Sequence, residues 1–163
     1  MEQLSSICSS GVADSEREPL ASFLRTTFSE ALQRGHGALV AQLTSDGSLL
    51  RNPIDLTNAV RQHEKERTPE TLDRLLSYAS LLEGMLSSDG IVLLTSKGEV
   101  GGYNFFVHAP PEEGTPPRNM IGGARRRAFR SLCKSVEKQE LIAAFFRSSD
   151  GTTEYYGPHN DGL

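Results

Sequence analysis

The stretch MIGGARRRAFR, residues 120–130, joins two glycines to three consecutive arginines. Apolar residues recur at helical spacing through Phe129, Leu132 and Val136, so the pattern predicts a helix over residues 122–136. The first turn of a helix presents unpaired backbone N–H groups at the positive end of its dipole. Glycine allows a ligand to approach the backbone closely, and arginine pairs with phosphate oxygens. The stretch therefore predicts a phosphate-binding helix start.

Positive charge is concentrated around this helix start. Residues 114–136 carry six Lys or Arg and no Asp or Glu, whereas the whole chain has a formal net charge of −4. An acidic protein with one basic segment is expected to bind an anion locally rather than a nucleic acid polymer. The alternative interpretation is a solvated basic face, because Arg126, Arg130 and Lys134 are four residues apart and share one side of the helix. Arg125 instead aligns with the apolar positions that face the protein.

The composition is that of an ordinary soluble globular protein. The 163 residues, 37% hydrophobic and 23% charged, are enough for one domain with a proper core. Two cysteines are too few for a disulfide framework or a metal cluster, which favours a reducing, cytoplasmic environment. No apolar run approaches the ~20 residues of a membrane span, so no membrane association is expected. We expect a flexible segment over residues 1–14, a domain over residues 15–157 and a tail over residues 158–163.

The hydrophobic pattern predicts that helices and strands alternate along the chain. We expect helices over residues 15–34, 68–86 and 122–136, and strands over residues 35–43, 91–95, 100–107, 141–146 and 152–156. Residues 49–56 are expected to be extended around a proline, and residues 57–67 fit either a weak surface helix or a loop. The wide apolar stripe of the helix at 68–86 predicts that it is central to the core. This order predicts one α/β domain built on a single mixed β-sheet flanked by helices.

Asp89 and Gly90 stand between the helix at 68–86 and the buried strand at 91–95. Asp-Gly is ordinary turn chemistry. Beside an arginine-rich helix start, however, a carboxylate at a strand mouth can hold Mg²⁺ or Mn²⁺ or a sugar hydroxyl while the arginines hold phosphates. The common signatures GxxxxGK[ST], HExxH, CxxC and GxSxG are absent from the sequence. The two features together predict a nucleotide site.

In this order the motifs resemble those of the diadenylate cyclase (DAC, DisA-N-like) domain family, whose members make cyclic di-AMP from two ATP molecules. That family carries an Asp-Gly-Ala motif before a strand hairpin, a Gly-Thr-Arg-His-Arg-Ala-Ala motif at a helix start, and Ser-Glu-Glu-Thr-Gly after a strand. The similar segments here are DGIVLL from Asp89, GARRRAF from Gly123 and FRSSDG from Phe146. The segment GALVA from Gly37 also resembles the family's opening strand. The resemblance covers roughly residues 19–156 and implies the DAC fold.

The resemblance also implies which residues form the site. The nucleotide and phosphate ligands would be Gly90, Gly122, Gly123, Ala124, Arg125, Arg126 and Arg127. Asp89 would be the catalytic and metal-binding residue of an active member, with Mg²⁺ or Mn²⁺ as its cofactor. Active members of the family pair face to face, so a homo-oligomer is implied as well.

Several positions depart from the family pattern: Ile91 stands for an alanine, Ala124 for a threonine, Arg126 for a histidine, and Ser148 and Ser149 for an acidic pair. The charge that binds phosphate is kept, while carboxylates that serve metal and proton chemistry are lost. We therefore expect a signalling domain of the sensor type, which binds ATP or a cyclic di-AMP-type ligand without efficient cyclisation. An active diadenylate cyclase, a nucleotidyltransferase, is the first alternative. A protein-interaction scaffold without a ligand is the second, and the involvement of a separate effector protein is left open.

Overall fold

A six-stranded mixed β-sheet forms the centre of the molecule. The computed structural model describes residues 5–6, 8–33, 37–44, 52–107 and 123–158. The strands are β1 (Ala38–Leu43), β2 (Ile54–Asp55), β3 (Ile91–Leu94), β4 (Glu99–Phe105), β5 (Leu141–Arg147) and β6 (Thr153–Tyr156). Their order in the sheet is β2-β4-β3-β1-β5-β6. β1 pairs with β3 in parallel, and the other neighbouring strands pair in antiparallel fashion.

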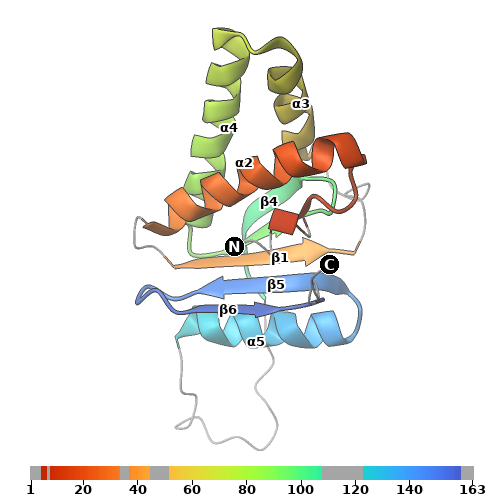
Figure 1. The fold of residues 1–163 in the computed structure, drawn as a ribbon. Helices are drawn as coiled ribbons and strands as arrows, with labels where there is room; N and C mark the ends of the chain where they lie inside the picture. Colours follow the sequence, from red (N-terminus) through yellow and green to blue (C-terminus); the bar gives the residue numbers. More distant parts are fainter. Residues whose placement is uncertain (1–4, 7, 34–36, 45–51, 108–122, 159–163) are drawn as a thin grey trace, which may run out of the picture.

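Helices cover both faces of this sheet. They are α2 (Asp14–Gln33), α3 (Leu56–Glu66), α4 (Pro69–Leu86) and α5 (Ala124–Glu137). Figure 1 shows α2, α3 and α4 on one side of the sheet and α5 on the other. The predicted α/β class, with one mixed sheet flanked by helices, is confirmed. None of the helices in the described residues is both long and apolar enough to cross a membrane.

The core consists of two layers, because alternate residues of a strand face opposite sides of the sheet. On the α2 side, Leu24 and Phe28 pack with Val40, Val92 and Phe145. On the α5 side, buried residues of the helix and three strands form a second cluster: Leu39, Ala41, Ile91, Phe129, Leu132, Ala144 and Phe146. The rings of Phe129 and Phe146 stack there, with centroids 5.6 Å apart. This second cluster fixes α5 against the sheet.

The helix α4 is less buried than its apolar stripe predicts. Leu82 and Leu86, near its C-terminal end, are buried, whereas Leu72 and Leu76 in the first half are 42% and 55% exposed. In Figure 1, α3 and α4 project side by side from the sheet. The buried apolar residues of α4 lie in its last turns, and Leu75 and Tyr78 pack against the same core while only partly buried. The expectation that the whole helix is central to the core was therefore wrong.

Residues 57–67, for which the sequence left a helix or a loop open, lie almost entirely within α3. The Asp55 side chain caps this helix by accepting a hydrogen bond of 3.0 Å from the backbone N–H of Asn58. Leu56 and Val60, on the buried side of this helix, pack into the core. The extended segment expected over residues 49–56 is shorter, since β2 contains two residues, Leu56 already belongs to the helix, and residues 49–51 lie outside the described residues.

Part of the N-terminal segment, expected to be flexible over residues 1–14, is buried, while the described residues from Ser10 to Asp14 are mostly exposed. Cys8 and Ser9 are fully buried, and the backbone N–H of Gly11 donates a 2.8 Å hydrogen bond to the carbonyl of Ser96. Burial raises the pKa of the Cys8 thiol to about 12. Cys8 belongs to the α2-side core, and the buried residues Ser5, Cys8 and Ser9 are small and show no apolar period, so the sequence pattern did not predict their burial.

The C-terminal half follows the prediction closely. β3 with β4 and β5 with β6 form the two expected hairpins. The helix α5 begins after Gly123, whose extended backbone provides the N-cap without a side-chain bond. The predicted site residue Gly122 and the residues of the tail after Pro158 lie outside the described residues.

Candidate functional site

The ends of five elements, β1, β3, β4, β5 and α5, meet at one edge of the sheet. β1 and β3 run in parallel, so both begin at this edge, and the pairing of Ile91 with Phe105 places the end of β4 there. The pairing of Ala38 with Arg147 adds the end of β5. Figure 1 shows that α5 begins at the same edge as β1, on the far side of the sheet from α2. The arginine-rich helix start and Asp89 are thereby brought together.

A cleft of about 610 Å³ lies at this edge. Leu39 of β1 and Ile91 of β3, which belong to the α5-side core, lie at its base. The first turns of α5 line one side with Ala124, Arg125, Arg127 and Ala128, and the end of β4 lines another with Phe105, Phe106 and Val107. Asp89 completes the lining. The volume is in the range that holds a small molecule or a cofactor.

Asp89 and Arg125 form an ion pair in this cleft. Nη2 of Arg125 donates to Oδ1 of Asp89 over 2.6 Å, although the two residues are 36 positions apart in the sequence. The Arg125 side chain is 27% exposed and that of Asp89 is 89% exposed, so the carboxylate lies at the solvent side of the pair. A guanidinium group has five N–H donors, and one carboxylate oxygen leaves most of them available to an anion.

Gly37 makes room for the Arg125 side chain. A Cβ atom on Gly37 would lie closer than 3.0 Å to Nη1 of Arg125 and 2.9 Å from the carbonyl oxygen of Arg147. The guanidinium group therefore packs directly on the backbone at the start of β1. Gly37 was not assigned to the site from the sequence. The one hint of its role was its position directly before a buried strand.

Gly90 has a structural role beside the cleft. A Cβ atom there would lie 2.5 Å from the carbonyl carbon of Asn104 and 2.9 Å from the backbone nitrogen of Phe105. This close approach of two backbones brings the end of β4 next to Ile91. Gly90 itself is not among the residues that line the cleft.

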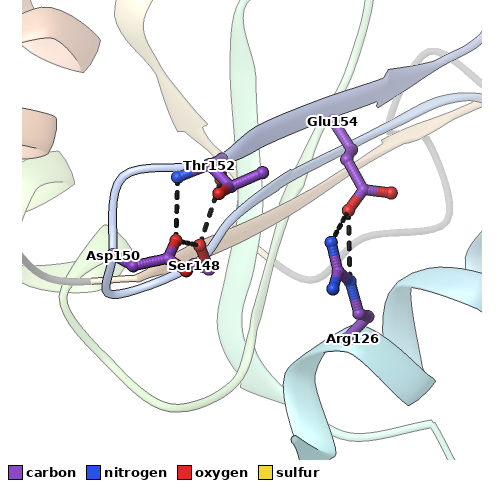
Figure 2. Close-up of polar contacts among 5 residues, drawn as sticks. All are labelled: Arg126, Ser148, Asp150, Thr152 and Glu154. Carbon is purple, nitrogen blue, oxygen red and sulfur yellow. Dashed lines mark hydrogen bonds and ion pairs between the residues drawn. The ribbon is translucent and has the colours of Figure 1, made fainter. Parts of the chain in front are cut away.

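Arg126 points to a different partner from Arg125. Its Nε donates to Oε1 of Glu154 over 3.1 Å, and its Nη2 donates to the same oxygen (Figure 2). Its guanidinium carbon lies 5.9 Å from the centroid of the Phe146 ring. The hydrogen bonds to Glu154 raise the pKa of Arg126 above its usual value. The structure thus divides the arginine run, with Arg125 and Arg127 lining the cleft and Arg126 bound to β6. A Cβ added at Gly123 would meet no atom within 4 Å, so packing does not require glycine there.

Ser148 and Ser149, which the resemblance aligns with an acidic pair of the family, lie at the turn between β5 and β6. The Ser148 hydroxyl donates to the carboxylate of Asp150, and the backbone N–H of Thr152 donates to the same oxygen over 3.0 Å (Figure 2). These hydrogen bonds, that of Ser148 first, lower the pKa of Asp150 to about 2. Asp150 is thus engaged within its own turn.

The described residues offer little for a metal ion. They contain no group of three or more His, Cys, Asp or Glu side chains that could hold one. Asp89 is the one carboxylate among the described residues that line the cleft. Mg²⁺ is commonly held by one or two carboxylates together with substrate phosphates. Asp89 fits that role only when a phosphate ligand supplies the other oxygens.

A scan against protein-family models finds no matching family, and a search of curated proteins finds no match to this chain.

Proposed function

We propose that this chain is a DAC-like domain of the sensor type, which binds ATP or a cyclic di-AMP-type ligand in the cleft at the start of α5. The observation that carries the proposal is the meeting of Asp89 and Arg125 in one cleft, where Arg127 adds a second cation. Two guanidinium groups at a helix N-terminus suit a phosphate chain. The apolar base of the cleft suits the remainder of a nucleotide.

The order of the elements supports a DAC-type fold as part of the same proposal. Asp89 and Gly90 directly precede the β3–β4 hairpin, and the segment from Gly123 opens α5. The turn from Ser148 to Gly151 follows β5. Each of the three similar segments therefore has the place relative to helices and strands that the resemblance leads us to expect.

Loss of carboxylates favours a sensor over an enzyme. Ser148 and Ser149 cannot bind a metal as carboxylates do, and Asp150 is held by hydrogen bonds within its turn. The phosphate-binding side keeps Arg125 and Arg127. Mg²⁺ or Mn²⁺, if bound with the ligand, would be shared between Asp89 and the phosphates.

Thermal unfolding with and without ATP or cyclic di-AMP tests ligand binding. A ligand at a hundred times its Kd stabilises the folded state by ~2.7 kcal/mol. For a chain of this length that corresponds to a rise in Tm of about 5–10 °C. The matched control is Arg125→Ala, which removes a cation from the cleft and is expected to reduce the rise. Unchanged Tm with both ligands at millimolar concentration would overturn the proposal and favour the protein-interaction scaffold.

An active diadenylate cyclase is a second candidate, because the exposed carboxylate of Asp89 is kept at the cleft. The resemblance implies that two domains would meet face to face, each with one ATP, and that pyrophosphate would leave. Incubation with ATP and Mn²⁺, followed by chromatography, detects cyclic di-AMP. If the wild type forms cyclic di-AMP and Asp89→Asn does not, the protein is an active cyclase and the sensor proposal is wrong.

A further inference from the structure

The cleft has two sides of different chemistry. Its charged residues are Asp89, Arg125 and Arg127, and every other described residue of the lining is apolar. The apolar side is formed by the end of β4 and the two residues after it, and in the sheet order β3 lies between β4 and β1, the nearer of the two strands on which α5 packs. A ligand that fills the cleft therefore meets cations on one side and aromatic rings on the other.

The two aromatic rings on the β4 side are exposed to an unusual degree. Phe106 is 66% exposed and Phe105 is 44% exposed, whereas Phe129 and Phe146 on the same face of the sheet are almost fully buried. Exposed aromatic side chains in a concave region are typical of ligand-binding surfaces. The end of β4 thus offers ring faces that the described part of the protein leaves uncovered.

The position of these rings follows from the packing of the sheet. α5 packs on β5 and β1, so among the described elements it does not extend over β4. Phe105 pairs with Ile91, whose side chain belongs to the α5-side core. A Cβ atom on Gly102 would lie 2.7 Å from Cε2 of Phe105, so the ring lies across this glycine. The missing side chain of Gly102 thus leaves the space that the Phe105 ring occupies along the strand.

We propose that the base of the nucleotide stacks on Phe105 and Phe106, and that the site accepts adenine and guanine alike; this inference rests on the proposed nucleotide binding. Telling two purines apart requires donors and acceptors that reach the edge of the base. The side chains of the described residues on this side of the cleft offer none, since Leu39, Ile91 and Val107 are apolar too. Stacking on an aromatic ring is tolerant of base identity because every base has a π-face.

Isothermal titration of the full chain with ATP, GTP and inorganic tripolyphosphate tests this inference. ATP and GTP are expected to bind with affinities within about threefold of each other. Phe106→Ala is expected to weaken both nucleotides by roughly five- to a hundredfold, since losing a base–aromatic stack costs ~1–3 kcal/mol at ~1.4 kcal/mol per tenfold. Phe106→Leu keeps apolar volume without a π-face and is expected to lose most of the same factor. Tripolyphosphate has no base, so its binding is expected to be unaffected by either substitution.

Tyr103→Ala is the matched control, because Tyr103 is a 53% exposed aromatic residue of β4, three positions before Phe106, that does not line the cleft. This variant is expected to bind both nucleotides like the wild type. Nucleotide binding that survives Phe106→Ala unchanged, or a preference of more than tenfold between ATP and GTP, would overturn the stacking inference and leave the proposed function standing. Failure of the folded wild type to bind ATP and GTP here, and cyclic di-AMP in the thermal test above, would overturn the proposed function and this inference together.

Discussion

Asp89→Asn removes the charge that Arg125 faces in the cleft while keeping the size of the side chain. The ion pair is short, 2.6 Å, but the Asp89 side chain is 89% exposed to solvent. Exposed ion pairs contribute about 0.2–1 kcal/mol to folding. The free energy of unfolding is therefore expected to fall by no more than ~1 kcal/mol.

The same substitution is expected to strengthen the binding of ATP in the absence of metal. A phosphate that takes the Nη2 donor of Arg125 has to replace the Asp89 carboxylate there, so removal of the ion pair returns about 0.2–1 kcal/mol to the ligand. At ~1.4 kcal/mol per tenfold, this raises the affinity by roughly 1.4- to fivefold. Removal of the repulsion between carboxylate and phosphate acts in the same direction.

Isothermal titration with ATP in EDTA, at low and at high salt, measures this gain. The gain should shrink at high salt, because salt screens exposed charges. Asp73→Asn is the control, since it removes the same charge from an exposed position on α4 that does not line the cleft. An affinity that is equal or lower in Asp89→Asn than in the wild type, with Asp73→Asn unchanged, would refute the competition between Asp89 and phosphate.

Three further predictions concern neighbouring residues. Gly37→Ala places a Cβ against the Arg125 guanidinium, so ATP affinity and Tm should both fall, because overpacking lowers the free energy of unfolding by about 1–3 kcal/mol. Gly123→Ala, whose Cβ meets no atom, should lower Tm less in the same thermal scan, since it loses only the preference for glycine at the N-cap of α5. Arg126→Ala should leave ATP affinity within twofold of the wild type by titration, whereas Arg125→Ala should lower it at least tenfold, because only the second residue lines the cleft. The lowered pKa of Asp150, about 2, means that its hydrogen bonds stabilise the fold above the unfolded pKa of ~3.9 and are lost as pH falls towards 2. Tm measured between pH 2 and 5 should therefore fall more steeply in the wild type than in Asp150→Asn; parallel curves would contradict this.

The elements were predictable where local signals agreed. α5 has helical periodicity after two glycines, and the Asp-Gly turn separates α4 from a run of buried residues in β3. That Asp89 and the arginine-rich helix start share one site was expected from the two features taken together, whereas the ion pair between Asp89 and Arg125 was not predicted. Periodicity places an apolar face on a helix, but it does not say how far along the helix a sheet extends. For that reason Leu72 and Leu76 are spaced as residues of a buried helix face, yet both are exposed.

Other features depend on contacts between distant segments, which a single sequence does not reveal. Glu154 is 28 residues from Arg126, and nothing in either local pattern joins them. The demand for glycine at position 37 comes from a side chain that approaches from α5. In the sequence, Phe105 and Phe106 look like ordinary residues at the end of a strand. They are exposed beside the cleft because α5 packs on β5 and β1.

The start of α5 is held by ion pairs to two different parts of the sheet. Arg125 binds Asp89 before β3, and Arg126 binds Glu154 on β6, so consecutive residues are tethered in different directions. The helix start therefore keeps its position before any ligand arrives, and little conformational entropy remains to be lost when an anion binds its N–H groups. Salt that screens both pairs should loosen this end of the helix, and weaken anion binding, at concentrations that leave the sheet folded.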